Sequence, residues 1–330
     1  MSQTLPSLSD HLSDAGRLDV AAIAADPSPA AIAGAVEDAL ELARRAYVAG
    51  EPDAMRALEH LLYRIHVRAS FGAPVEPVLA ATWSVLIRAG LRTWLGLYDG
   101  PSEVEPAAMR PLLEAAVHEH GAFNHPLLAR YDEDGERGYG VFVKNWFGSC
   151  HGFSQQLTAL AQRSQGKAKM IVLENLDDEF DGETHDTLRT RFIASLGHRF
   201  DAMGALEDPD RVVESFALLN FRTALCALPD PAYALGSFYT TEANWPPECQ
   251  RHLAINRRRG LDERALAYWT THATADTDHA EAWIAALEGA YRDPVSCGRV
   301  VRGGVAQLKL RRRMYDAMMN HIDHDGGARV

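Results

Sequence analysis

The sequence predicts an all-α fold, and three observations support this prediction. Most long segments repeat apolar residues at helical spacing, with Glu and Arg on the opposite face. No run rich in Val, Ile and Thr alternates with polar residues between hairpin turns. Hydrophobic residues make up 47% of the 330 positions, which is ample material for a large core. We therefore expect a helical bundle with a helical extension before it.

The extension covers residues 1–120. Helical periodicity predicts helices at Ala30–Val48, Ala54–Ala69, Val75–Leu97 and Pro106–Glu119. The third of these is the most apolar and should be buried on most sides, and the Gly100-Pro101 pair ends it. A packing or dimerisation layer is the expected role of the extension, so a homodimer is the expected assembly.

The second region, residues 121–330, follows a break at Gly121–Gly140 that is rich in Gly, Asp and Glu. Periodicity then predicts seven helices, at Val141–Ser164, Lys167–Leu176, His185–Gly204, Asp210–Ala227, Ala234–Gly260, Asp262–Tyr291 and Gly298–His321. Seven helices fit one bundle, whose core is a natural place for metal ligands.

Composition excludes several classes of function. A formal charge of −12 and a pI near 5.6 argue against a nucleic-acid partner. No apolar run approaches the roughly 20 residues that cross a bilayer, so no membrane partner is expected. The N-terminus lacks a secretory signal pattern, which predicts a cytoplasmic protein. Four separated cysteines without a CxxC pair indicate reduced thiols rather than disulfides or a zinc-thiolate site.

The most informative motif is His272-xxx-Asp276-xx-His279, inside a predicted helix. Spacings of four and seven residues place the three side chains on one helix face. Two imidazoles and a carboxylate are ligand types that iron, manganese or zinc prefer. A polar, solvated face is the competing interpretation. Trp269 and Trp283 favour burial of this helix, and buried charge must be paired or bound to metal.

Glu174 and His185 are candidate ligands further upstream. They are eleven residues apart, which on an unbroken helix means about 16 Å of rise, too far for one metal site. If both bind, the helix must break near Asp177–Gly182, where Asp and Gly favour a turn. Two alternatives stay open here: a whole helix that pairs His185 with Asp181, or a solvated acidic turn.

Glu242 is the remaining candidate, after an aromatic run and on a helix that Pro246 is expected to interrupt. A surface glutamate is the alternative interpretation. Two other kinds of metal protein are excluded by their motifs. The sequence contains no Glu-x-x-His, which ferritin-like carboxylate bundles need twice, and no HExxH of a metalloprotease.

In this order the motifs resemble the heme-oxygenase-like diiron oxidase superfamily, over roughly residues 120 to 320. The lead-in His125-Pro126 and the Arg258-Arg-Gly260 turn add to the resemblance. It implies a seven-helix bundle without heme, two Fe(II) ions, O2 as cosubstrate and an external electron donor. By position, the family's metal ligands correspond to Glu174, His185, Glu242, His272, Asp276 and His279. Six such ligands leave coordination positions open for O2 and substrate.

The resemblance implies an oxidase or oxygenase of a superfamily that uses amino acids, small amines and fatty acids. Among these, we expect a small amino-acid-like metabolite as the substrate. Members that oxidise nitrogen often carry an extra carboxylate on the first core helix, but Gly138–Val172 contains no Asp or Glu. This favours C–H abstraction that leads to desaturation, cyclisation or C–C cleavage. The first alternative is an N-oxygenase that forms N-hydroxy, nitroso or nitro products. The second is a metal-free helical binding protein, or a relative with thiaminase-like or quinone-cofactor-synthase-like chemistry.

Substrate contacts are predicted for two arginines and several aromatic side chains. Arg189 and Arg222 could clamp a substrate carboxylate, although surface salt bridges are the alternative. The aromatic side chains predicted to line the pocket are Trp146, Phe153, Tyr239 and Trp245. Packing in the core is the alternative role for each of them. The basic run Lys309–Arg313 is predicted to be a solvated helix face.

Overall fold

The computed structural model describes residues 28–70, 77–133, 135–150, 152–180, 184–197 and 208–326, without side chains at 67–70, 135–136, 147–150 and 325–326. Within these ranges every regular element is helical, which confirms the predicted class. The chain forms two compact units, Met1–Gly96 and Leu97–Val330. The boundary therefore lies earlier than residue 120, because the helix that follows Pro106 packs against the C-terminal helix of the second unit.

The first unit contains α3 (Pro29–Ala43), the π-helical turn η1 (Arg44–Val48), α4 (Pro52–Ser70) and α5 (Pro77–Leu95). Each α-helix begins at a proline, whose fixed φ and missing N–H suit the first helical position. The Ser28 side chain accepts a hydrogen bond from the amide of Ala31 and so caps α3. These elements confirm the three helices predicted up to residue 97.

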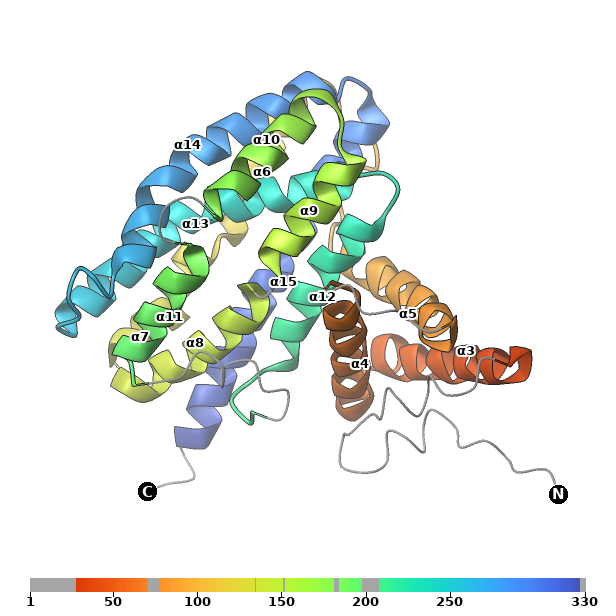
Figure 1. Ribbon diagram of the computed structural model, residues 1–330, viewed down its shortest axis with the longest axis horizontal. Coiled ribbons are helices and arrows are strands. Elements are labelled where there is room, and N and C mark those ends of the chain that lie inside the picture. Colours follow the sequence, from red (N-terminus) through yellow and green to blue (C-terminus); the bar gives the residue numbers. More distant parts are fainter. Residues whose placement is uncertain are drawn as a thin grey trace. The chain divides into compact units, whose positions relative to one another are not determined.

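The second unit holds the remaining helices, and Figure 1 shows their arrangement. They are α6 (Pro106–His120), the 3₁₀ turn η2 (Ala122–Asn124), α7 (Leu127–Glu133), α8 (Gly135–Cys150), α9 (Phe153–Arg163), α10 (Gly166–Asp178), α11 (His185–Ser195), α12 (Val213–Ala227), α13 (Ala232–Arg258), α14 (Ala267–Ala290) and α15 (Pro294–Gly326). Helix α13 is the centre of this unit, since it packs along both α14 and α15. Helix α10 lies beside α9 on one side and α14 on the other.

The predicted and observed helices differ most clearly at three places. The expected helix 141–164 is divided between α8 and α9 at Gly152, which has a left-handed φ of 77°. The expected break at 121–140 is largely helical, because η2, α7 and the start of α8 occupy it. Pro246 and Pro247 do not interrupt α13. They only deprive the carbonyls of Glu242 and Ala243 of helical partners, and tight packing on α14 and α15 holds the helix together.

An aromatic core fills the space between α8, α13 and α14. Trp146 and Trp269 lie 5.1 Å apart between ring centroids, and Phe142 stacks on His252 at 4.5 Å. All four side chains are almost fully buried. The cysteines with described side chains are free and buried, as the sequence predicts. Among the described helices, none is long and apolar enough to cross a membrane.

Candidate metal centre

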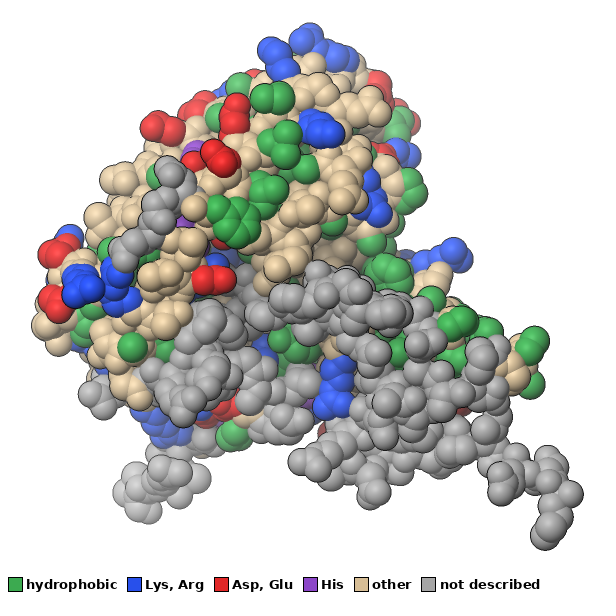
Figure 2. Space-filling model, in the orientation of Figure 1, with side chains coloured by type: hydrophobic (Ala, Val, Ile, Leu, Met, Phe, Trp, Pro, Cys, Tyr) green, Lys and Arg blue, Asp and Glu red, His purple; other side chains and the backbone are tan. Residues whose placement is uncertain are grey.

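A cavity opens between α10, α11, α13 and α14 and encloses about 530 Å³ of space, part of it open to solvent. Its lining combines acids, histidines, arginines and aromatic rings: Phe153, Asn175, Asp178, Glu179, His185, Arg189, Arg222, Thr241, Glu242, Trp245, Tyr268, His272, Asp276, His279 and Arg311. Figure 2 shows acidic side chains and a histidine gathered on the face over α10 and α14. A second cavity shares Asp178, His185, Asp276 and His279 with the first.

One group of ligand-type side chains consists of Glu242 from α13 and Asp276 and His279 from α14. One donor atom from each lies within 4.8 Å of the others. His279 Nδ1 lies 3.6 Å from Glu242 Oε2 and 3.5 Å from Asp276 Oδ1. This buried nitrogen has no hydrogen-bond partner among the described residues. The gap between the three side chains suits a metal cation, because metal bonds to N and O ligands are about 2.0–2.2 Å long.

The electrostatics of this group also suit cation binding. Burial and the charge of Glu242 raise the pKa of Asp276 to about 8. The carboxylates of Asp276 and Glu242 raise the pKa of His279 to about 10. Like charges held together out of water favour protonated carboxyl groups unless a cation neutralises them. A divalent ion would hold both carboxylates ionised and leave His279 neutral.

A second group also lines the cavity and contains Glu179, His185 and His272. His185 Nδ1 lies 2.8 Å from Glu179 Oε1, and the rings of His185 and His272 are 4.5 Å apart. His272 Nδ1 donates to the carbonyl oxygen of Tyr268 at 2.8 Å. A carbonyl only accepts, so the lone pair of His272 is on Nε2. Burial and the charge of His185 lower the pKa of His272 well below its usual value, which keeps the imidazole neutral, as metal binding requires.

The chain reaches this geometry because the helix breaks where the sequence predicts. Helix α10 ends at Asp178 and α11 begins at His185. The Thr184 hydroxyl caps α11 by accepting from the Thr187 amide. The break is thus confirmed, and it turns His185 back toward the end of α10.

Five of the six predicted ligands line the cavity, and Glu174 does not. Its side chain is exposed on α10, one turn before the helix ends. Asp178 and Glu179 occupy its expected place, and Asp178 Oδ2 lies 2.9 Å from His279 Nε2. The position of the break explains this correction. The acids nearest to the break approach His185. Because α10 ends at Asp178, these acids are Asp178 and Glu179, and Glu174 lies one turn too early.

The predicted substrate residues divide in the same way. Arg189, Arg222 and Phe153 line the cavity. Trp146 is buried in the aromatic core and is absent from the lining. Tyr239 lines a different cavity, beside Pro246 and Pro247, because it points to the opposite side of α13.

Arg311 corrects the prediction of a solvated face at Lys309–Arg313. It is buried, lines the cavity and donates to both oxygens of Glu248 at 2.9 Å. The signal was present in the sequence. Arg311 falls on the helical stripe of Leu308, Met314 and Tyr315, all of which are buried. Tyr268 and Asn175 also line the cavity without a prior prediction, and no motif marks them.

The donor set fits iron. Carboxylate oxygens and imidazole nitrogens from four helices face one cavity, and no thiolate with a described side chain is among them. His272 has its second nitrogen held by a backbone carbonyl, which is the usual support of a metal-binding imidazole.

Comparison with known proteins identifies the family and the fold of this chain. The model of a family described as iron-containing redox enzymes matches residues 141–312, which include every candidate ligand. A 4-aminobenzoate synthase from Chlamydia pneumoniae is 28% identical over 174 residues, covering 51% of this chain and 76% of that protein. A crystal structure from Shewanella denitrificans, a domain of unknown function with a heme oxygenase-like fold, superposes with a TM-score of 0.53. It is 15% identical and covers 66% of this chain and 91% of the other. The chain therefore belongs to the family of iron-containing redox enzymes and has a heme oxygenase-like fold.

Proposed function

We propose that this chain is an O2-dependent non-heme diiron oxidase or oxygenase. The observation that carries the proposal is the buried His279 Nδ1, which lies between the carboxylates of Glu242 and Asp276 and has no hydrogen-bond partner among the described residues. These three side chains would hold one iron. His185, His272 and an acid at the end of α10, Asp178 or Glu179, would hold the other.

The chain's own residues prepare the second of these two sites. The carbonyl of Tyr268 fixes the ring of His272, and Glu179 fixes that of His185, so each imidazole presents its other nitrogen. Iron(II), when bound, supplies electrons for the reduction of O2 and an oxidant for the substrate. An external electron donor would restore the iron(II) state.

A small amino-acid-like carboxylate is the proposed substrate. Arg222 is buried at the cavity, with its guanidinium 5.7 Å from the ring centroid of Phe153. Asn175 Oδ1 is a buried acceptor without a hydrogen-bond partner among the described residues. A carboxylate on Arg222 and an ammonium group on Asn175 would match these two side chains. The name of the relative, 4-aminobenzoate synthase, gives an aromatic amino acid as the product of that protein. This product belongs to the same chemical class as the substrate proposed here.

C–H abstraction, leading to desaturation, cyclisation or C–C cleavage, is the proposed reaction. No described α8 side chain lines the cavity, and Gly138–Val172 contains no carboxylate. This favours oxidation at carbon over the competing N-oxygenation. Superfamily members that oxidise nitrogen often carry an extra carboxylate on the first core helix. The mass of the product formed with labelled O2 separates the two, since N-oxygenation adds labelled oxygen to nitrogen.

Anaerobic iron(II) titration with Mössbauer detection tests the metal centre. We expect wild-type protein to bind two irons and Asp276→Ala to bind fewer. The matched pair is Asp178→Ala and Glu174→Ala, one turn apart on α10. The first should weaken binding, because Asp178 lines the cavity. The second should match wild type, because Glu174 is exposed. Saturation at one iron in wild type and Asp276→Ala alike would contradict the proposal.

A further inference from the structure

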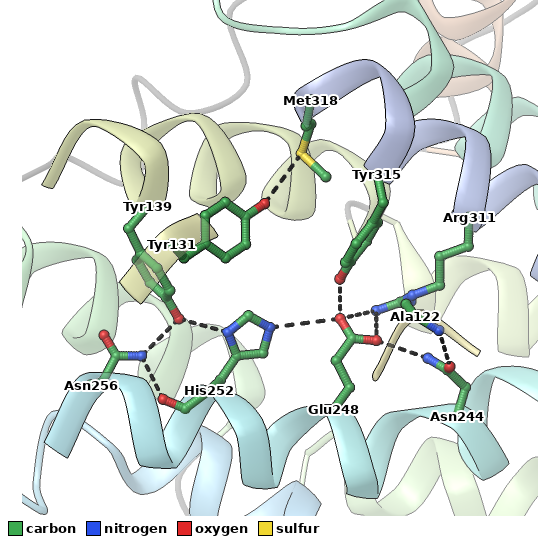
Figure 3. A network of polar contacts seen from close by, with 10 residues as sticks. All are labelled: Ala122, Tyr131, Tyr139, Asn244, Glu248, His252, Asn256, Arg311, Tyr315 and Met318. Atoms are coloured by element: carbon green, nitrogen blue, oxygen red, sulfur yellow. Dashed lines mark hydrogen bonds and ion pairs between the residues drawn. The ribbon is translucent and has the colours of Figure 1, made fainter. Parts of the chain in front are cut away.

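A second buried site lies behind Trp269, on the side of α13 that faces α8 and α15. It consists of Tyr139, His252, Asn256 and Glu248, and all four side chains are fully buried (Figure 3). The hydroxyl of Tyr139 lies 2.9 Å from His252 Nδ1. None of these residues lines the cavity, so the proposed metal chemistry does not use them directly.

The direction of each hydrogen bond in this site is fixed by its neighbours. Asn256 Nδ2 lies 2.8 Å from the carbonyl oxygen of His252, which can only accept. This assigns the amide orientation, so the second hydrogen of Nδ2 is donated to the Tyr139 oxygen at 2.7 Å. Tyr139 must then donate its own hydrogen to His252 Nδ1. Figure 3 shows the bonds to Asn256 and His252 meeting at the phenol oxygen of Tyr139.

His252 is prepared to receive that proton. Burial lowers its pKa, so the imidazole is neutral and Nδ1 carries a lone pair. Its Nε2 lies 3.6 Å from Glu248 Oε1. Burial alone would raise the pKa of Glu248, but Arg311 and His252 outweigh it and lower the pKa to about 2. An anionic carboxylate thus stands where an imidazolium at residue 252 would be stabilised.

Aromatic rings connect this pair to the cavity. The ring of His252 lies 4.4 Å from that of Trp269, and Trp269 lies 5.2 Å from Tyr268. Tyr268 lines the cavity and lies 4.1 Å from the candidate ligand His272. Every step is a ring-to-ring contact inside the protein core, so an electron can move along it without crossing solvent.

We propose that Tyr139 and His252 form a redox-active pair that donates one electron to an oxidised iron centre in the cavity. The O–H bond of Tyr139 breaks and an N–H bond forms at His252 Nδ1. The electron would pass through Trp269 and Tyr268 to an iron held by the candidate ligands, whose oxidation state would fall by one. The products are a neutral tyrosyl radical and an imidazolium beside Glu248, so charge and protons balance. This inference rests on the proposed iron chemistry.

Tyr131 provides a matched control within the same core. Its ring lies 5.5 Å from that of Tyr139 and is equally buried. Among the described residues, however, the hydrogen-bond partner of its hydroxyl is the sulfur of Met318, at 3.9 Å, and a thioether is not a base. Tyr131 therefore cannot pass its proton to a neighbour on oxidation. If the proposal is right, Tyr139 is redox-active and Tyr131 is not, although both are buried in the same core.

Freeze-quench EPR of iron-loaded protein mixed with O2 tests the pair, with ring-deuterated tyrosine to identify the radical. A tyrosyl signal is expected in wild type and Tyr131→Phe, and its loss is expected in Tyr139→Phe. His252→Gln keeps the phenol but removes the base, and it should also lose the signal. Circular dichroism and iron stoichiometry show whether each variant is folded. An undiminished signal in Tyr139→Phe, or no tyrosyl signal in wild type that binds iron, would overturn the pair.

A second experiment separates this inference from the metal centre. The guanidinium of Arg259 lies 5.2 Å from the Tyr139 ring centroid and is partly exposed. A ruthenium polypyridyl label on Arg259→Cys can therefore oxidise Tyr139 by flash-quench in protein without iron. A tyrosyl transient that disappears with Tyr139→Phe and with His252→Gln supports the pair even if iron binding fails. A transient that is independent of both substitutions overturns it.

Discussion

Glu248 is fully buried, and its charge depends on a complete set of partners. Arg311 donates to both oxygens at 2.9 Å, Asn244 donates at 2.8 Å and the Tyr315 hydroxyl donates as well. Arg311 in turn lies over the ring of Trp245 at 4.5 Å, at the wall of the cavity. The ion pair thus orders a cavity side chain as well as the core.

We expect Glu248→Gln to destabilise the fold by roughly 3–5 kcal/mol, because it leaves the Arg311 charge buried and uncompensated. Adding Arg311→Met should restore part of the loss, since it removes that charge. Glu263→Gln is the control. It breaks an exposed pair with Arg257 at 2.9 Å and should cost less than about 1 kcal/mol. Urea unfolding followed by circular dichroism measures all three, and equal effects of the two Gln variants would contradict the argument.

The same residues predict acid sensitivity. The pKa of Glu248 is about 2 in the folded chain, below its ordinary 4.5, so its stabilising contribution is complete above pH 4.5 and is lost as the pH falls toward 2. The lowered pKa of His252 acts in the same direction from its ordinary 6.5 downward, because only the unfolded chain takes up that proton. The difference in urea midpoint between wild type and Glu248→Gln should therefore shrink from pH 7 to pH 3, because protonation removes the charge that the variant lacks. An unchanged difference would contradict this.

At the scale of elements, the close approach of α13 and α15 holds the second unit together. A Cβ at Gly303 would lie 2.0 Å from the carbonyl oxygen of Tyr233, and one at Gly236 would lie 1.9 Å from that of Val300. Both obstacles are backbone atoms, which cannot turn aside as a side chain can. Glycine is required here by contact, not by an unusual φ.

Gly303→Ala should therefore destabilise the protein by roughly 3 kcal/mol or more, because the two helices must separate to admit the methyl group. Gly289→Ala on α14 is the matched control. Its Cβ would meet only the flexible chain of Lys167, at 3.2 Å. There, the higher helix propensity of alanine should offset the contact, so the free energy of unfolding should stay within about 1 kcal/mol of wild type. Thermal unfolding compares the two variants, and similar melting temperatures would refute the contact argument.

For the whole molecule, every candidate ligand lies in the unit Leu97–Val330. We expect residues 97–330, produced alone, to bind iron with the stoichiometry of the full chain. Anaerobic iron titration of both proteins tests this. Loss of iron binding from a folded fragment would show that the first unit contributes to the site.

The role of the first unit stays a prediction. If residues 1–96 form a dimerisation layer, light scattering should give a dimer for the full chain and a monomer for residues 97–330. The same oligomeric state for both proteins would exclude a role of residues 1–96 in dimerisation.

Three features were determined by the sequence itself: the helical class, the break between α10 and α11, and the placement of His272, Asp276 and His279 on one helix face. These depend on local physics: periodicity, turn residues and helix geometry act over a few neighbouring positions. The resemblance to heme-oxygenase-like diiron enzymes rested on the same short motifs, and the family match confirms the iron-containing redox family.

The tertiary structure decided which acid on α10 faces the histidines, and it replaced Glu174 by Asp178 and Glu179. It also buried Arg311 against Glu248 and joined Tyr139 to His252, 113 positions away. Such choices depend on the rotation of each helix about its axis and on contacts between distant segments. Both are set by packing of the whole unit, which no local pattern contains.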